Sequence, residues 1–282
     1  MPVTTNFGKG SALPLNPKYC HWSKEFIESH VGRDTELTAY IHIDPSYQVN
    51  SNMLALYEFQ RKPLLNQFKS VVIDREQGII LSKRSSQALI NDLIKNHFLA
   101  GLTFQKEIAQ RLNFKSHYVL ATGRLAYFST HGYTTGNTDW LSLHQMVNYQ
   151  VSEINRVKFK SLPINGLNYT FEFVNCGRYI KRKISDSLYY NYVLSQLGQA
   201  HLENILGWNV VKKRSQSLLD KAEYYLPHFI HEPFTIRDIW NDVLQHKYLK
   251  YGECMADLFE LQLIREDHYF VYRLSRRGDN LF

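Results

Sequence analysis

The stretch that decides the fold reads RVKFKSLPINGLNYTFEFV and covers residues 156–174. Apolar and charged residues alternate in its first part, and this period of two is typical of a strand with one buried face. Asn165 and Gly166 then form a turn signal, and a second alternating run follows. The stretch therefore predicts a β-hairpin.

Two turns are compatible with this hairpin, and they give different registers. A two-residue turn at Asn165 and Gly166 would set lysines opposite phenylalanines. A three-residue loop over 164–166, with Gly166 in the left-handed region, instead sets Lys158 opposite Glu172, a favourable cross-strand pair. We favour the three-residue loop because its register gathers four apolar side chains on one face: Val157, Phe159, Phe171 and Phe173.

The chain continues from the hairpin through a second turn at residues 175–177. The basic run from Arg178 to Ile184 is expected to form another strand. A helix from Asp186 to Leu206 follows, because its apolar residues recur at helical spacing. Ser185 or Asp186 can cap its start and Gly207 can end it.

Positive charge concentrates in and after the hairpin. Residues 150–214 contain ten basic residues and four acids, so ten minus four gives a local charge of +6. Such a cluster on a β-ribbon can neutralise DNA phosphates with salt-sensitive affinity. A solubilising face, or a sheet edge guarded by lysines, is the alternative. The candidate DNA-binding residues are Arg156, Lys158, Lys160, Arg178, Lys181, Arg182, Lys183, Lys212, Lys213 and Arg214.

Before the hairpin, the pattern predicts a mixed or antiparallel β core with packed helices. Helical spacing extends from Ser85 to Leu112 with an interruption near Gly101. A loop over 129–138, rich in glycine and threonine, leads to a buried Trp140. The expected strands, of which the first four belong to one sheet, are 38–43, 53–59, 70–73, 79–81, 117–121 and 125–128.

Three regions are expected along the chain, in an α+β fold. Residues 1–35 hold three prolines and no sustained periodicity, so we expect a loosely ordered arm. Residues 36–210 form the core, and residues 215–282 form a small C-terminal winged-helix-like domain. Its expected helices and hairpin follow in winged-helix order: 218–230, 235–244, 251–261 and 263–274.

Charge argues against DNA contact by this C-terminal module. It has eight basic and eleven acidic residues, so eight minus eleven gives −3. Acids repel phosphates, and a protein-contact or dimerisation role is therefore favoured. A second helix-turn-helix look-alike begins at Thr103–Leu112. It is weak because residues 115–124, where the recognition helix should follow, suit a strand better.

The sequence gives little support for an enzyme. No phosphate-binding loop, nucleophile elbow or metal-ligand spacing occurs, so no catalytic residue, metal site or cofactor is expected. His131, Asp139 and His144 flank the loop and could form an acid-base or metal group, with a structural histidine as the alternative. The three cysteines lie far apart and are expected to be reduced thiols.

The composition sets wider bounds. The 282 residues are 44% hydrophobic, which is enough to bury a sizeable core, and the formal charge of +7 favours polyanionic partners. No segment approaches the roughly 18 apolar residues needed to cross a bilayer, and the N-terminus lacks a secretory signal. We therefore expect a cytoplasmic protein without membrane contact.

Part of the chain resembles a known family. Residues 123–130, GRLAYFST, followed by Asn137, Trp140-Leu141 and the HQM at 144–146, are similar to the competence transcription factor (ComK) family. In that family a strand ending in Phe-Pro-Thr leads to Trp-Ile and a His-Ile or His-Val pair. The resemblance covers roughly residues 50–207. Ser129 replaces the family's proline, and Lys106-Glu107 replace a usual Gly-Arg pair.

The resemblance implies a transcriptional activator of DNA-uptake genes. It would bind AT-rich boxes of double-stranded DNA as a homo-oligomer, largely through the minor groove, where a narrow A-tract attracts arginine and lysine. RNA polymerase and a protease adaptor are further implied partners, the adaptor through residues 224–227. The alternative is a protein-interaction regulator that does not activate and that acts through the acidic C-terminal module.

Overall fold

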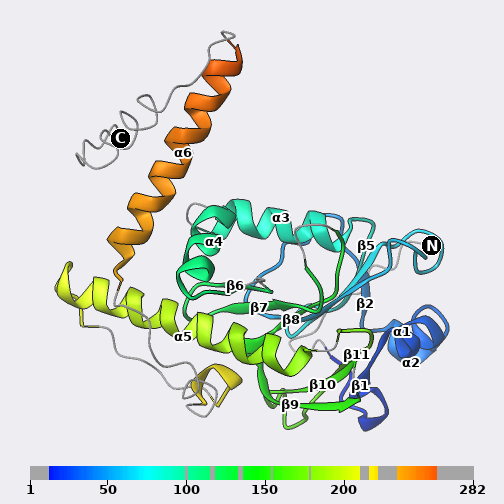
Figure 1. The fold of residues 1–282 in the computed structure, drawn as a ribbon. Helices are drawn as coiled ribbons and strands as arrows, with labels where there is room; N and C mark the ends of the chain where they lie inside the picture. The colour runs from blue at the N-terminus through cyan, green and yellow to red at the C-terminus, as the bar shows by residue number, and fades with distance from the viewer. Residues whose placement is uncertain are drawn as a thin grey trace.

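The computed structural model of the chain describes residues 13–98, 101–114, 118–132, 136–153, 155–177, 179–209, 216–221 and 234–258. These residues form two stacked β-sheets with helices around them (Figure 1). The expected α+β class, with packed helices on a β core, is confirmed.

The larger sheet has seven strands in the order β2-β5-β4-β3-β8-β7-β6. Neighbouring strands are antiparallel except β2 and β5, which run parallel. All six strands expected before the hairpin are present, and the first four lie in this one sheet as predicted. The first, expected at 38–43, begins only at Ile41 because Thr38 lies in a short helix. The strands are β2 (Ile41–Ile43), β3 (Met53–Glu58), β4 (Ser70–Asp74), β5 (Gly78–Ser82), β6 (Val119–Ala121), β7 (Ala126–Ser129) and β8 (Trp140–Ser142).

Each face of this sheet is buried against a different layer. Leu56, Val72 and Trp140 belong to a cluster that includes the apolar residues of α3 (Ser86–His97). Tyr57 and its neighbours on the other face join the main core, which they share with the second sheet. The Tyr57 ring stacks on Phe173 of that sheet with centroids 5.0 Å apart. The larger sheet is therefore the central layer.

The smaller sheet contains the predicted hairpin. Its order is β1 (His21–Trp22), β11 (Thr170–Phe173), β10 (Arg156–Ser161) and β9 (Met146–Glu153), which follows the short helix η2 (Leu143–Gln145). The preferred register is confirmed: Phe159 pairs with Phe171 and Lys158 with Glu172. The four side chains predicted to face inward are buried: Val157, Phe159, Phe171 and Phe173.

The predicted register is right, but the three-residue loop from which it was predicted is wrong. The Ile164 and Leu167 backbones bond to each other, so the turn has two residues, and Asn165 (φ 51°) and Gly166 (φ 84°) are both left-handed. Further in, the Ser161 N–H donates to the Tyr169 carbonyl at 2.8 Å. Two residues, 162 and 163, therefore oppose the single residue 168. This bulge adds the one-residue shift that the three-residue loop was meant to supply.

A long helix, α5 (Ile180–Asn204), replaces the basic strand expected at 178–184. Ile180, Ile184 and Leu188 are buried at a spacing of four, so they place one apolar face of the helix in the main core. The cations between them hid this spacing in the sequence. The helix that was expected to begin at Asp186 begins six residues earlier, at Ile180.

The helix α4 (Gly101–Arg111) closes the β6 edge of the larger sheet. The Gln105 side chain donates to the Ala121 carbonyl at 3.0 Å, and its oxygen accepts the Ala121 N–H at 3.1 Å. The Tyr190 hydroxyl of α5 also lies within 3.1 Å of the Gln105 side-chain oxygen. Since β6 is an ordinary strand, the helix-turn-helix interpretation of this region is excluded.

The prediction of a loosely ordered arm over residues 1–35 is wrong from residue 13 on. The chain there forms η1 (Pro17–Tyr19), β1 and α1 (Lys24–His30), and α2 (Thr35–Thr38) follows. Apolar residues of this segment enter the main core, which explains its order despite the prolines: Leu13, Tyr19, Trp22, Ile27 and Val31. The sequence lacked sustained periodicity here because each element is short.

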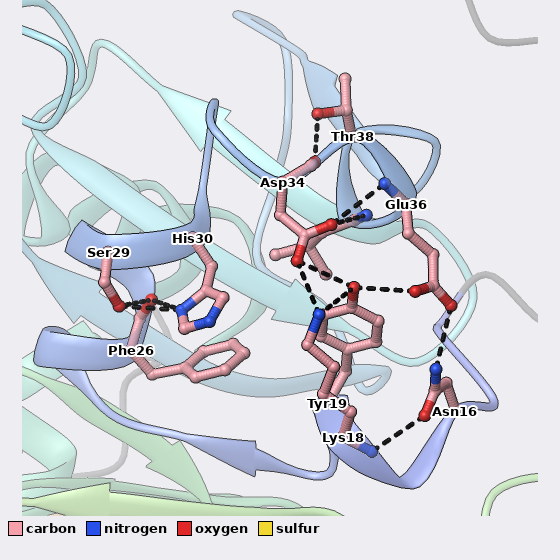
Figure 2. A network of polar contacts seen from close by, with 10 residues as sticks. Asn16, Lys18, Tyr19, Phe26, Ser29, His30, Asp34, Glu36 and Thr38 are labelled. Carbon is pink, nitrogen blue, oxygen red and sulfur yellow. Dashed lines mark hydrogen bonds and ion pairs between the residues drawn. The ribbon is translucent and has the colours of Figure 1, made fainter.

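A polar network ties these short elements together (Figure 2). The Tyr19 hydroxyl lies 2.9 Å from a carboxylate oxygen of Asp34 and 3.0 Å from one of Glu36. The Lys18 ammonium lies 3.1 Å from Asp34, which also accepts the backbone N–H groups that begin α2. Asn16 donates to Glu36 at 3.1 Å.

The C-terminal part differs from the expected winged helix. After η3 (Leu218–Asp220), a single helix, α6 (Ile236–Leu258), stands where two helices, 235–244 and 251–261, were expected. Residues 245–250 contain no helix breaker, and Gly252 lowers helix stability by only about 1 kcal/mol, so the helix continues. The expected hairpin 263–274 and most of helix 218–230 lie outside the described residues.

Candidate nucleic-acid interface

The outer face of the smaller sheet is open to solvent and polar. This sheet lies on the side of the molecule opposite α3 (Figure 1). One row across the four strands contains His21, Thr170, Lys160 and Asn148. The next row contains Glu172, Lys158 and Gln150. His21, Lys160, Asn148 and Gln150 are exposed.

The cations of this face come from β10, because alternation turns every second side chain of that strand outward. They are Arg156, Lys158 and Lys160, and against Glu172 they leave three minus one, a formal +2, on strands β1, β10 and β11. Glu153 of β9 is the register partner of Arg156. The side chains of Arg156 and Lys158 are 43% and 39% exposed. The face therefore presents a line of accessible cations along one strand.

Glu172 lies between these cations. Its carboxylate is only 10% exposed, with Oε2 2.7 Å from His21 Nε2 and 3.8 Å from Lys158 Nζ. Its other oxygen, Oε1, is 3.4 Å from Arg156 Nε and makes no hydrogen bond among the described residues. Three basic side chains from two strands thus converge on one carboxylate.

The basic residues after the hairpin are distributed over different roles. Lys181 and Arg182 are exposed on the first turn of α5, and Arg182 is 3.7 Å from Asp186. Lys183 instead donates to the Cys176 carbonyl at 3.1 Å, and its ammonium lies 4.3 Å from the Tyr118 ring centroid. Lys183 is therefore tied to the fold. The others, Arg178, Lys212, Lys213 and Arg214, lie outside the described residues.

The start of α5 lies next to the start of β10. The Cys176 N–H, in the segment that leads into α5, donates to the Asn155 carbonyl at 2.9 Å. The first turn of α5 carries no acid, so Lys181 and Arg182 add their charge to the positive end of the helix dipole. This arrangement is electrostatically unfavourable, and Asp186, 3.7 Å from Arg182, offsets part of it. The first turn of α5 therefore adds two exposed cations near the start of β10.

His21 is the residue of this face that sequence reasoning missed. It lies in the segment expected to be a loose arm, on a strand of only two residues that pairs in parallel with β11. A strand this short has no periodicity, and its partner is about 150 residues away in the chain. The strand β9 was also missed, although Val147, Tyr149 and Val151 show the period of two that could have found it.

The residues considered for catalysis, His131, Asp139 and His144, have different environments. His144 is buried, and its Nε2 lies 3.0 Å from the Ser51 carbonyl while Nδ1 accepts the Ala126 N–H at 3.2 Å. Burial lowers the pKa of His144, so the ring is neutral near pH 7. Asp139 accepts the Glu58 N–H at 2.7 Å and pairs with Lys24 at 2.8 Å. His131 is exposed.

No cluster of three or more metal-ligating side chains occurs in the part of the chain that the structure describes. The buried Cys176 thiol has its pKa raised to about 12, chiefly by burial, so it is unreactive as a nucleophile. Among the sites considered, the basic face of the smaller sheet is therefore the one that brings several accessible side chains together.

Comparison with protein-family models, with curated proteins and with solved structures finds no match for this chain. The similarity to competence transcription factors therefore rests on the residues quoted above. Within the described residues, none of the helices has both the length and the apolar character needed to cross a membrane.

Proposed function

We propose that this chain is a DNA-binding transcription regulator that contacts DNA with the outer face of its smaller sheet and the first turn of α5. The observation that carries the proposal is the line of accessible cations on β10, with the exposed Lys181 and Arg182 on the first turn of the helix that follows the sheet. Cations held on a rigid strand neutralise phosphates and release counterions, which gives salt-dependent affinity.

The more specific part of the proposal follows from the resemblance to competence transcription factors. On that basis the DNA sites are AT-rich, the contact is made largely in the minor groove, and the protein acts as a homo-oligomer that activates DNA-uptake genes. The shape of an open, cation-bearing sheet is compatible with this, because a narrow groove attracts lysine and arginine without a recognition helix.

Selection of bound sequences from random DNA at two salt concentrations tests the proposal. We expect enrichment of AT-rich sequences, and we expect Lys158→Gln with Lys160→Gln to weaken binding and to flatten the dependence on salt by about 0.9 for each phosphate that the variant no longer neutralises. Lys95→Gln, an exposed lysine at the end of α3, is the control and should change neither. Equal affinity for the parent and the double variant would overturn the assignment.

Two further measurements separate the parts of the proposal. Replacing A·T by I·C pairs preserves the minor groove and alters the major groove, so loss of binding on this exchange would reject the minor-groove contact. A reporter behind an AT-rich promoter tests activation. Binding without activation would favour the alternative regulator that acts through protein contacts.

A further inference from the structure

The carboxylate of Glu172 is an unusual group to find in a surface that attracts anions. It lies 10% exposed in the row of Lys158, and no other acid occurs on the described outer face of strands β1, β10 and β11. A negative charge at this point repels nearby phosphates and reduces the formal charge of these three strands from +3 to +2. Cross-strand pairing with Lys158 therefore does not by itself explain why an acid stands at this position.

The contacts of Glu172 with the two strand cations are loose. Lys158 at 3.8 Å and Arg156 at 3.4 Å are beyond the usual 2.7–2.9 Å of charge-assisted hydrogen bonds. Both side chains are about two-fifths exposed, so solvent weakens their attraction to the carboxylate. The two cations can therefore turn from the carboxylate to another anion, but this leaves the buried charge of Glu172 less compensated.

The carboxylate itself stays in place when the cations leave. His21 Nε2 is 2.7 Å from Oε2, and Glu172 is fixed in the middle of the sheet by pairing with Lys158 on one side and by β1 on the other. Oε1 has no hydrogen bond among the described residues, so Arg156 and Lys158 are also the cations that compensate its buried charge. Glu172 and an incoming phosphate thus require the same two side chains.

We propose that Glu172 acts as an internal competitor for Arg156 and Lys158, so that it lowers the affinity of the basic face for nucleic-acid phosphates. This inference rests on the proposed function and concerns the same site. This makes Glu172 a specificity-determining residue. Phosphate contacts then contribute less to the binding affinity, so the affinity depends more on contacts that recognise the base sequence or the shape of the groove.

Glu172→Gln tests the competition, because glutamine keeps the size and the hydrogen-bonding ability of the side chain and removes the charge. The probes are a short AT-rich duplex and a mixed-sequence duplex of equal length. We expect affinity for both to rise about threefold to tenfold, with a salt dependence steeper by about 0.9, and the preference for the AT-rich duplex to fall. Glu76→Gln, an exposed acid in the β4–β5 turn, is the matched control and should have no effect.

The same substitution in a variant that lacks the two strand cations tests whether Glu172 acts through them. If Glu172 acts through the strand cations, Glu172→Gln has no effect on affinity when Arg156 and Lys158 are already glutamine. Should the Gln variant fail to fold, Glu172→Asp, which withdraws the charge by one methylene, must also raise affinity.

The outcomes distinguish this inference from the proposed function. A parent protein that binds DNA while Glu172→Gln leaves affinity and salt dependence unchanged overturns the competition alone. A variant that binds more weakly shows that Glu172 only orients the cations. A parent protein that binds neither duplex overturns both.

Discussion

At the scale of single residues, the fold depends on side chains that satisfy the backbone where secondary structure ends. Gln105 is the clearest case, since its amide pairs with both backbone groups of Ala121 as a neighbouring strand would. A sheet edge that is buried under a helix needs such a partner, because an unpaired buried N–H or carbonyl is costly.

We expect Gln105→Leu to lower the free energy of unfolding by about 2–4 kcal/mol, because it leaves the Ala121 N–H and carbonyl without partners. Gln110→Leu is the matched control, since Gln110 is exposed on the same helix and its replacement should change stability by less than about 0.5 kcal/mol. Urea unfolding measures both. Equal losses for the two variants would contradict the role given to Gln105.

Asp34 is expected to make stability depend on pH. Hydrogen bonds from Lys18, then Tyr19, lower the pKa of Asp34 to about 2. Since this folded-state pKa lies below the unfolded value of about 3.9, Asp34 stabilises the fold above pH 4 and loses this contribution as the pH falls through about 2.

Asp34→Asn, which can still cap α2, should be less stable than the parent near pH 7, with a difference that shrinks between about pH 4 and pH 2. Urea titrations at several pH values test this. A difference that stays constant over that range would show that the charge of Asp34 is not what stabilises the segment.

At the scale of elements, the sequence predicted strands correctly where apolar and polar residues alternate over a whole strand. Residues 157–160 and 170–173 alternate over a full strand each, so the hairpin and its register could be recovered. The bulge at residues 162 and 163 could not, because nothing in the sequence distinguishes an extra loop residue from an extra strand residue. In the same way, charges between Ile180 and Ile184 concealed the first turns of α5, and the two residues of β1 carried no pattern at all.

The candidate site shows the same division. Its three cations on β10 followed from alternation alone, whereas His21 reached the site through a pairing that only the folded chain creates. Lys183 was predicted from composition and is instead tied to Cys176 and Tyr118. A charge count identifies a basic region, but the fold decides which cations remain accessible.

The first turn of α5 gives a prediction in which stability and binding change in opposite directions. Lys181→Glu places an acid at the positive end of the helix dipole, so it should raise the free energy of unfolding by about 0.3–1 kcal/mol while it weakens DNA binding. Lys95→Glu, the same change in the last turn of α3, should lower stability and leave binding unchanged. Thermal unfolding and a salt titration of DNA binding report the two effects. A Lys181→Glu variant that binds DNA as tightly as the parent would remove α5 from the interface.

At the scale of the whole molecule, η3 and the first half of α6 belong to the main core. Leu218, Ile239 and Val243 join the same apolar cluster as both sheets and α5. Asp242 of α6 pairs with Arg111 of α4, where Arg111 Nε is 2.9 Å from the carboxylate, and His246 is 2.9 Å from Glu107. The far end of α6 extends away from the core (Figure 1).

This continuity predicts that the core and the first half of α6 unfold together. Val243→Ala removes a fully buried side chain and should lower the free energy of unfolding by about 1–3 kcal/mol. Tyr251→Ala, at a side chain exposed further along α6, should change it by less than about 0.5 kcal/mol. Urea unfolding can be followed by far-UV circular dichroism and by tryptophan fluorescence. Both signals should give one transition, which shifts as a whole in Val243→Ala. The reason is that Trp22 and Trp140 in the core and Trp240 on α6 report on one cooperative unit. Two separate transitions in either signal, with only one of them shifted in Val243→Ala, would make α6 an independent unit docked on α4.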